Sequence, residues 1–378
     1  MNDIYQDSVA LHRKNGGKLA TISKVKVENK EDLSLAYTPG VAEVCRAIAK
    51  DKSEAYPLTL KGNTIAVISD GSAILGLGNL GASAAIPVME GKCILFKEFA
   101  GIDAFPICLD TQDAEEIIKT VKFLAPVFGG INLEDISAPR CFEIEERLKN
   151  ELDIPVMHDD QHGTATVVLA GLINSLKVRG SKKEEVKIVI SGAGAAGTAI
   201  AKMLIKYGFL NIIICDSVGI IYEERTDLNS EKIELAKSTN RLLIKGNLRD
   251  AILGADIFVG VSKPGILTAE MVKTMAEKPI IFALANPVAE IMPEVAREAG
   301  AFIIATGRSD YPNQVNNVLA FPGIFRGALD NRVKKITDEM LIKAAEVLAS
   351  FVENPEVDIV LPNPFEKGIA QAIAKVIL

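Results

Sequence analysis

Residues 186–207, VKIVISGAGAAGTAIAKMLIKY, decide how the second half of this chain folds. The apolar run at 186–190 is typical of a buried strand, and the glycines after it lead directly into a helix that Gly208 ends. The next apolar run, at 211–215, predicts a second strand that ends at Asp216. A strand, a glycine turn, a helix, a strand and an acid together form the full context of a dinucleotide-binding fingerprint.

The glycines of this turn have separate physical roles. Gly192 permits the tight turn, Gly194 lets a pyrophosphate approach the backbone, and Gly197 lets helix and strand pack closely. The helix N-terminus adds N–H donors and a positive dipole for the phosphates. We therefore expect the cofactor to be bound by Gly192, Ala193, Gly194, Ala195, Ala196 and Gly197.

The acid after the second strand bears on the choice of cofactor. Asp216 lies where a carboxylate bonds the ribose hydroxyls of a dinucleotide. It would repel a 2′-phosphate, and Val218 offers no cation to offset that repulsion. The sequence therefore favours NAD, with NADP as the alternative.

A second glycine run, at 76–81, also matches GxGxxG and follows a predicted strand at 64–69. Pro87 interrupts the helix expected behind it, and the apolar run at 93–96 predicts a further strand. The acid after this run, Glu98, directly follows the cation Lys97, which is unlike the acid that ends a dinucleotide fingerprint. We therefore interpret this run as a ligand-facing loop and not as a second dinucleotide site.

Two pairs of adjacent acids, Glu134-Asp135 and Asp159-Asp160, each lie close to an apolar run without a neighbouring Lys or Arg. Carboxylates resist such crowding unless a cation holds them together, and oxygen ligands suit Mg²⁺ or Mn²⁺. Neighbours on a strand point to opposite faces, so Glu134 and Asp135 can share an ion only in a loop or at a strand end.

Two alternatives to this metal site stay open. Each acid pair could instead stabilise the N-terminus of the helix after it. His158 and His162, at i and i+4, could bind zinc on a helix, but no Cys or third His lies nearby. Histidines that form hydrogen bonds beside the site are the preferred interpretation.

Composition narrows the class of protein. The chain has 378 residues with 48% hydrophobic side chains, which suggests two domains with sizeable cores. A net charge of −7 argues against nucleic-acid binding. Five scattered cysteines without a CxxC motif are typical of reduced thiols in a cytoplasmic protein. The polar start is unlike a signal peptide, and no apolar run approaches the roughly 18 residues of a membrane span.

Strands alternate with helices along the chain, which predicts an α/β fold. We expect an N-terminal α/β domain for substrate and metal at residues 1–160. A C-terminal Rossmann-type domain at 161–378 would contain a doubly wound parallel sheet and closing helices, with a polar link at 179–185 before its first strand. Ligands bind beyond the carboxyl ends of such strands, so Asn286 and the pair Asn316-Asn317 should face cofactor or substrate. The alternative is that these amides only stabilise turns.

A dinucleotide and a hard metal in one chain suggest a defined chemistry. A metal can bind the carboxylate and hydroxyl of a 2-hydroxy acid and make the hydroxyl easier to deprotonate, while hydride leaves for the nicotinamide. A second carboxylate β to the new ketone can then depart as CO₂. Such a site needs a base and an acid, and a lysine with a lowered pKa and a tyrosine suit these roles.

The chain closely resembles the malic enzymes of the compact bacterial type over essentially all 378 residues. The motifs that carry the resemblance are LSLAYTPGVA at 33–42, DGSAILGLGNLG at 70–81, Gly91-Lys92, NLEDI at 132–136, HDDQHGT at 158–164, ANP at 285–287 and NNVLAFPG at 316–323. The resemblance implies oxidative decarboxylation of (S)-malate to pyruvate and CO₂ with reduction of NAD or NADP and a requirement for Mg²⁺ or Mn²⁺.

The resemblance also implies residue roles. Tyr37 would be the general acid and Lys92 the general base. The metal ligands would be Glu134, Asp135 and Asp160. The residues that position cofactor and malate, or lie beside them, would be Asn286, Asn317, Asn316, Asp159, Gly76 and Gly78. The family is usually dimeric or larger, so Tyr37 could reach a neighbour's site.

One position departs from the family pattern. Larger relatives have an arginine that grips a malate carboxylate where this chain has Ala73, so donors such as the N–H groups of loop 76–81 must replace it. Alternatives are a malolactic-type enzyme that keeps NAD bound and releases lactate, a dinucleotide-sensing protein whose catalytic half has decayed, and a dehydrogenase for another β-carboxylated hydroxy acid.

Overall fold

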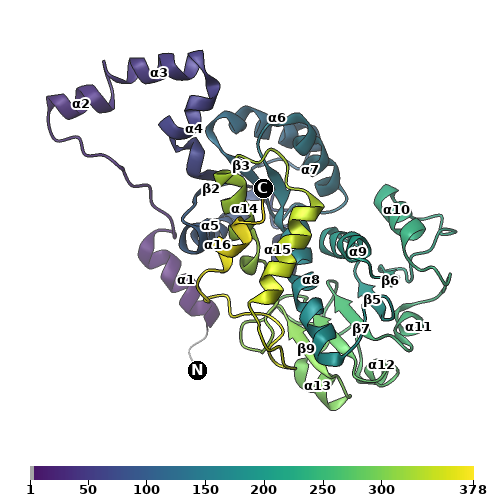
Figure 1. The fold of residues 1–378 in the computed structure, drawn as a ribbon. Coiled ribbons are helices and arrows are strands. Elements are labelled where there is room, and N and C mark those ends of the chain that lie inside the picture. The colour runs from purple at the N-terminus through teal and green to yellow at the C-terminus, as the bar shows by residue number, and fades with distance from the viewer. Residues whose placement is uncertain (1–3) are drawn as a thin grey trace.

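The computed structural model describes residues 4–378, which form two parallel β-sheets covered by helices (Figure 1). The predicted α/β fold with a Rossmann-type second half is therefore confirmed. Buried apolar residues from both sheets, such as Ile65 and Ile188, belong to one continuous core. No helix among the described residues is long and apolar enough to cross a bilayer.

The first sheet has the strand order β2-β1-β3-β4, and all its pairs are parallel. Its strands are β1 (Thr64–Ser69), β2 (Asp103–Cys108), β3 (Gly130–Leu133) and β4 (Val156–His158). Leu133 at the end of β3 pairs with His158 at the end of β4. The two acid pairs therefore leave the same edge of the sheet side by side.

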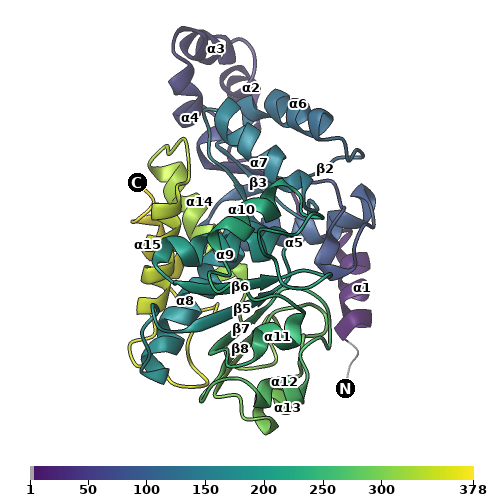
Figure 2. The same ribbon diagram turned by 90° about the vertical axis from the view of Figure 1, so that its right-hand side faces the viewer.

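The second sheet has the strand order β6-β5-β7-β8-β9, again all parallel (Figure 2). Its strands are β5 (Lys187–Ser191), β6 (Asn211–Cys215), β7 (Ile257–Gly260), β8 (Ile280–Ala283) and β9 (Ile303–Thr306). Alternate residues of β5 pack into different cores: Ile188 and Ile190 on one face and Val189 on the other. Both faces are therefore covered, as a doubly wound sheet requires.

Helices lie between the strands along the chain, and three more follow the last strand. Those of the first half are α5 (Ala82–Ala100), α6 (Ala114–Leu124), α7 (Arg140–Glu151) and α8 (Asp159–Arg179). Those of the second half are α9 (Ala195–Tyr207), α10 (Ser230–Ser238), α11 (Leu248–Ile252), α12 (Ala269–Lys273), α13 (Pro293–Glu298), α14 (Phe321–Asp330), α15 (Asp338–Ser350) and α16 (Ile369–Ala374). Short 3₁₀ turns are η1 (Lys52–Glu54), η2 (Leu60–Asn63), η3 (Ile74–Gly76), η4 (Ala125–Val127) and η5 (Asn317–Leu319).

The strand predicted at 93–96 is wrong, because these residues lie inside α5. Pro87 is accommodated within that helix. A run of four apolar residues cannot distinguish a strand from a buried helix. Phe96 is fully buried against Phe321 and Phe325 of α14, with ring centroids 4.7 and 5.4 Å apart. Burial by a C-terminal helix therefore explains the composition of the run.

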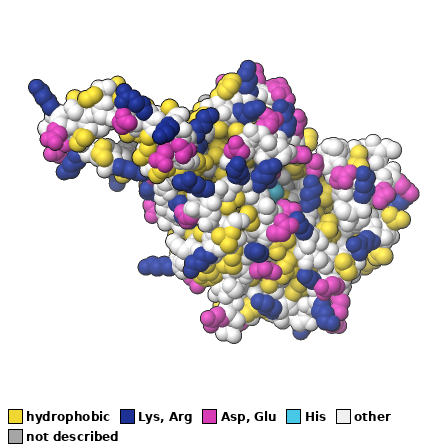
Figure 3. All heavy atoms as spheres, turned by 45° about the horizontal axis from the view of Figure 1, so that its top comes forward, with side chains coloured by type: hydrophobic (Ala, Val, Ile, Leu, Met, Phe, Trp, Pro, Cys, Tyr) yellow, Lys and Arg dark blue, Asp and Glu magenta, His cyan; other side chains and the backbone are white. Residues whose placement is uncertain are grey.

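The N-terminal segment forms an arm beside the body. It contains α1 (Ile4–Asn15), α2 (Lys30–Ala36), α3 (Val41–Lys50) and α4 (Ala55–Leu58). None of these helices has a buried residue. In Figure 1, α2 and α3 stand away from both sheets, and Figure 3 shows hydrophobic side chains on the surface of this projection.

Candidate active site

The first acid pair occupies a sharp turn directly after β3. Asp135 has a φ of +53°, a left-handed conformation that is uncommon outside glycine. The N–H of Ala73 donates to the Asp135 carbonyl at 3.0 Å, which ties this turn to the glycine-rich loop after β1. Because Glu134 and Asp135 lie beyond the strand, they are free of the alternation that would send them to opposite faces.

The second acid pair opens α8. His158 is the last residue of β4, and Asp159 and Asp160 form the first turn of the helix. The dipole of α8 therefore favours the negative charge of this pair, as expected if the acids stabilise the N-terminus of the helix after them. For the first pair that alternative is wrong, because α7 begins only at Arg140.

Three carboxylates converge here on a common point. Glu134, Asp135 and Asp160 each offer an oxygen, and these oxygens lie within 4.8 Å of one another. The N–H of Asp135 also donates to Asp160 Oδ2 at 2.9 Å. Burial and then the charges of Asp160 and Glu134 raise the pKa of Asp135 to about 9.

The donor set fits a hard divalent cation. Asp135 Oδ2 is buried without a hydrogen-bond partner, and Asp159 Oδ1 nearby is in the same state. Three mutually repelling carboxylate oxygens are the ligands that Mg²⁺ and Mn²⁺ prefer. Among the described residues, the group able to share an ion contains no histidine, which does not favour the zinc alternative.

Lys92 reaches this cluster from α5. Its Nζ lies 2.6 Å from Asp159 Oδ2 and 2.9 Å from Glu134 Oε1, and 4.4 Å from the centre of the Phe321 ring. Burial alone lowers the pKa of Lys92, but the charges of Asp159 and Glu134 outweigh it and the pKa is raised. The expected lowered pKa is therefore wrong in this structure, because the surrounding acids stabilise the ammonium form.

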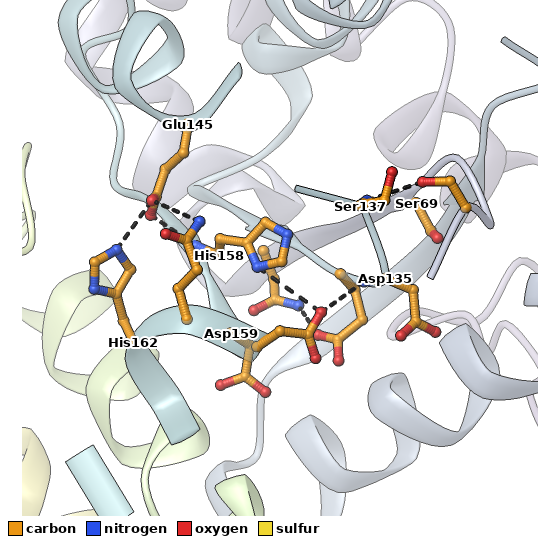
Figure 4. A network of polar contacts seen from close by, with 12 residues as sticks. Ser69, Asp135, Ser137, Glu145, His158, Asp159 and His162 are labelled. Carbon is orange, nitrogen blue, oxygen red and sulfur yellow. Dashed lines mark hydrogen bonds and ion pairs between the residues drawn. The ribbon is translucent and has the colours of Figure 1, made fainter. Parts of the chain in front are cut away.

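Behind the acids lies a buried polar network that the sequence analysis missed (Figure 4). Glu145 of α7 accepts the His158 N–H at 2.8 Å and contacts His162 Nε2 at 3.0 Å and Lys149 Nζ at 2.7 Å. These contacts fix the start of α8. Although burial opposes it, the charges of His162 and Lys149 hold the pKa of Glu145 well below its usual range.

Two further polar groups support the acids. His158 is fully buried, and its Nδ1 lies 3.8 Å from Asp160 Oδ2. Asn132 of β3 donates from Nδ2 to Glu134 Oε2 at 2.8 Å. Asn132 lies on an apolar strand, two residues before Glu134. A single amide in an otherwise apolar strand was the sequence signal that could have marked it as part of the site.

The dinucleotide fingerprint has the backbone geometry that its sequence predicted. Gly192 has a φ of +115°, and a Cβ there would lie 2.5 Å from the carbonyl oxygen of Val261. A Cβ on Gly197 would lie 1.8 Å from the carbonyl oxygen of Gly192, so the helix can approach the turn only without a side chain. Gly194 faces open space. The alanines of the motif, Ala193, Ala195 and Ala196, lie in this turn and the first turn of α9.

Asp216 follows β6 as expected, but two cationic side chains contact its carboxylate. Its carboxylate contacts Arg225 Nη1 at 2.9 Å and Lys232 Nζ at 2.6 Å. The expected lack of an offsetting cation is therefore wrong, since cations come from residues 9 and 16 positions after Asp216. Burial opposes ionisation, yet hydrogen bonds from Arg225 and Lys232 hold the pKa of Asp216 below its usual range.

The predicted amides lie in the segments that follow β8 and β9: Asn286 comes shortly after β8, and Asn316-Asn317 lie at the start of η5. A Cβ on Gly76 would be 2.4 Å from the carbonyl oxygen of Asn286, so the glycine loop of the first sheet touches the second here. Asn317 lies near Asp159, since a Cβ on Gly163 would meet both side chains. The Asn316 side chain accepts the Val318 N–H at 3.0 Å and thus stabilises its own turn.

The loop expected to bind a substrate carboxylate uses several N–H groups internally. Ile74 donates to the carbonyl of Gly78, while Leu80 and Gly81 donate to that of Gly71. The role of Gly76 and Gly78 in carboxylate binding stays a prediction. Tyr37 is not brought to the acids, because it lies in the arm with 65% of its surface exposed.

Comparison with known proteins gives consistent matches over nearly the whole chain. Residues 16–149 match the model of the malic enzyme N-terminal domain, and residues 161–377 match that of the malic enzyme NAD-binding domain. The chain is 58% identical over 375 residues to the bifunctional malic/malolactic enzyme of Bacillus subtilis, covering 98% of this chain and 92% of the relative. It is 58% identical over 365 residues to the NAD-dependent malic enzyme of Geobacillus stearothermophilus, covering 96% and 76%.

A solved structure agrees with these sequence matches. The crystal structure of the NAD-dependent malic enzyme of Thermotoga maritima superposes with a TM-score of 0.96 at 53% identity. The match covers 98% of each chain.

Proposed function

Because this chain belongs to the malic enzyme family, we propose that it oxidises (S)-malate and decarboxylates the product to pyruvate and CO₂ while reducing NAD or NADP. The observation that supports this most directly is the convergence of Glu134, Asp135 and Asp160 next to the Lys92 ammonium. A general base beside a site for a hard cation is the arrangement that deprotonation of a 2-hydroxy acid needs.

The two halves of the chain would divide the work. Residues 1–160 would hold the metal and malate, and residues 161–378 would hold the dinucleotide on the turn at 192–197. When bound, Mg²⁺ or Mn²⁺ would act as a Lewis acid that eases loss of the hydroxyl proton and stabilises the enolate left by CO₂. The nicotinamide would accept the hydride from C2.

Lys92 would take the proton from the C2 hydroxyl. Its Nζ donates to Asp159 Oδ2 at 2.6 Å, so Asp159 orients the amine toward the cluster of acids. Asn286, which follows β8, and Asn317, at the start of η5, would orient malate against the cofactor.

Tyr37 would protonate the enolate, and we propose that it does so in the site of a second copy of the chain. The arm leaves large apolar side chains exposed: 49% of Leu33, 72% of Leu35 and 65% of Tyr37 itself. Such a surface is stable in water when a partner covers it. In a two-fold dimer each arm would reach the other body, so each site would contain Lys92 of one copy and Tyr37 of the other.

We retain NAD as the preferred cofactor. Asp216 stays ionised at the position from which a carboxylate would bond the ribose hydroxyls. Arg225 and Lys232 reduce the penalty that this carboxylate would impose on a 2′-phosphate, so the preference should be moderate.

All five cysteines are free thiols, in keeping with a reducing cytoplasmic location.

The direct test is malate turnover with NAD and NADP in parallel, each with Mn²⁺ and with a chelator. We expect NADH and CO₂ in equal amounts, dependent on the metal. The malolactic alternative has specific support, because one relative at 58% identity is named a malic/malolactic enzyme. Lactate and CO₂ without net NADH would identify that reaction, and no metal-stimulated turnover with either cofactor would refute both.

A further inference from the structure

A second buried carboxylate lies outside the acid cluster, in the cofactor half of the chain. Glu290 is 0% exposed. Its Oε1 accepts the N–H of Ser262 at 2.8 Å, and its Oε2 accepts the N–H of Ala285 at 3.0 Å. Its hydrogen-bond partners are thus backbone N–H groups, and burial raises the pKa of Glu290 despite them. A carboxylate in such surroundings is costly to bury.

The two donors belong to the edge of the sheet at which a dinucleotide binds. Ser262 follows the end of β7, and Ala285 follows the end of β8. The hydroxyl of Ser262 also lies 3.0 Å from that of Ser191 at the end of β5. Glu290 therefore joins the carboxyl ends of neighbouring parallel strands, where ligands of such sheets lie.

The chain makes room for this carboxylate. A Cβ on Gly260, the last residue of β7, would lie 2.4 Å from the carboxyl carbon of Glu290. The absence of a side chain there lets Glu290 pass beneath the strand end. The backbone carbonyl of Glu290 also accepts the N–H of Leu267 at 3.1 Å, which anchors the residue itself.

Asn286 directly follows Ala285, whose N–H donates to Glu290. It is exposed, yet two glycines approach it closely: a Cβ on Gly307 would lie 2.8 Å from its Nδ2, and a Cβ on Gly76 would lie 2.4 Å from its carbonyl oxygen. Gly76 belongs to the loop in which Ala73 donates to Asp135. Contacts therefore run from Glu290 through Asn286 to the turn that carries a proposed metal ligand.

We propose that Glu290 is a positioning residue for the reaction: by holding the N–H groups of Ser262 and Ala285, it fixes Asn286 against Gly76 and so sets the distance between the cofactor half and the metal half of the site. This inference rests on the proposed function. A glutamine can replace only one of the two acceptor oxygens, because its amide nitrogen donates. One partly buried N–H would then lose its partner, and the Ala285–Asn286 turn would be free to shift.

Glu290→Gln tests the inference, with Glu353→Gln on the exposed turn after α15 as the matched control. We expect kcat for malate oxidation to fall by about tenfold or more, because small misplacements cost large factors in rate. The Mn²⁺ affinity, measured by electron paramagnetic resonance, should stay within about twofold, since Glu134, Asp135 and Asp160 all belong to residues 1–160.

Gly260→Ala provides an independent variant that displaces the Glu290 carboxyl without changing its charge. It should reproduce the loss of kcat, and the double variant should be no worse than the more severe single one. A merely structural role would instead lower the melting temperature and leave kcat of the folded protein unchanged, which would overturn the inference. A loss of Mn²⁺ affinity as large as the loss of kcat would overturn it as well.

The two proposals can fail separately. If the unmodified protein bound NADH but turned over neither malate nor oxaloacetate, the proposed function would fail. NADH affinity, followed by fluorescence, would then still test Glu290, because the shifted turn should weaken binding about threefold or more in both variants. Unchanged NADH affinity in that case would refute Glu290 as a positioning residue.

Discussion

Co-expression of two inactive variants, Tyr37→Phe and Lys92→Ala, should restore activity if the arm completes the site of a second copy. In a two-fold dimer with exchanged arms, a mixed dimer has one site that combines intact Lys92 from the first variant with intact Tyr37 from the second. Its other site lacks both groups. The inference depends on Tyr37 lying in an exposed arm and Lys92 lying in the buried cluster.

The expected magnitude follows from counting sites. Random assortment of equal amounts makes about half of the dimers mixed, and each mixed dimer has one competent site of two. The pooled protein should therefore show about one quarter of the unmodified activity, and mixed dimers purified through two different tags about one half. Each variant alone should lose about 10²–10⁴-fold, the usual contribution of a general acid or base.

The assay is NADH formation from malate with saturating Mn²⁺, with each variant expressed alone as the baseline. Mass measurement of the purified mixed dimer confirms its composition. Activity of the mixed dimer no higher than this baseline would show that Tyr37 and Lys92 act within one chain, and the proposed exchange of arms would then be wrong. A stable monomer in solution would refute it independently.

Three other predictions test the site itself. Asp160→Asn should raise the Mn²⁺ concentration for half-maximal activity by about 10-fold or more, since even partners of a ligand contribute about 10–100-fold; an unchanged metal titration would remove Asp160 from the ligand set. Lys92→Ala should abolish malate oxidation with NADH affinity retained, and near-normal turnover would contradict its role as the base. The pKa of Glu145 is lowered on folding, so its contribution to stability is present above its unfolded pKa of about 4.3 and is lost as the pH falls below it. Glu145→Gln should therefore flatten the acid side of the unfolding free energy measured in urea between about pH 3 and 7, and a slope equal to that of the exposed control Glu353→Gln would refute this.

The cofactor-binding turn was the part of the site most open to prediction. Strand, glycine turn and helix at 186–207 are adjacent in sequence, and their spacing reflects steric limits that act over a few residues. The positive φ of Gly192 and the close approach at Gly197 are such limits. The prediction of a strand at 93–96 was wrong because long-range packing decides that segment. Helix α14, more than 200 positions away, buries this part of α5.

Two expectations about charge were wrong: a lowered pKa for the base lysine, and no cation beside Asp216. The residues that decide both lie elsewhere along the chain. The acids that raise the pKa of Lys92 lie 42 and 67 positions after it, at Glu134 and Asp159. The cations that hold Asp216 lie in the segment after β6, where no periodic pattern marks them. Charge interactions depend on distance in space, which sequence spacing does not report beyond one helical turn.

The sequence by itself determined the α/β class, the dinucleotide turn and the identity of the acids, because each follows from residue type and short-range periodicity. The tertiary structure alone decided that Glu134, Asp135 and Asp160 share a point, that Lys92 lies between two acids, and that Tyr37 stands apart in an arm. The physical reason is that parallel strands bring their carboxyl ends together only through the packing of the whole chain.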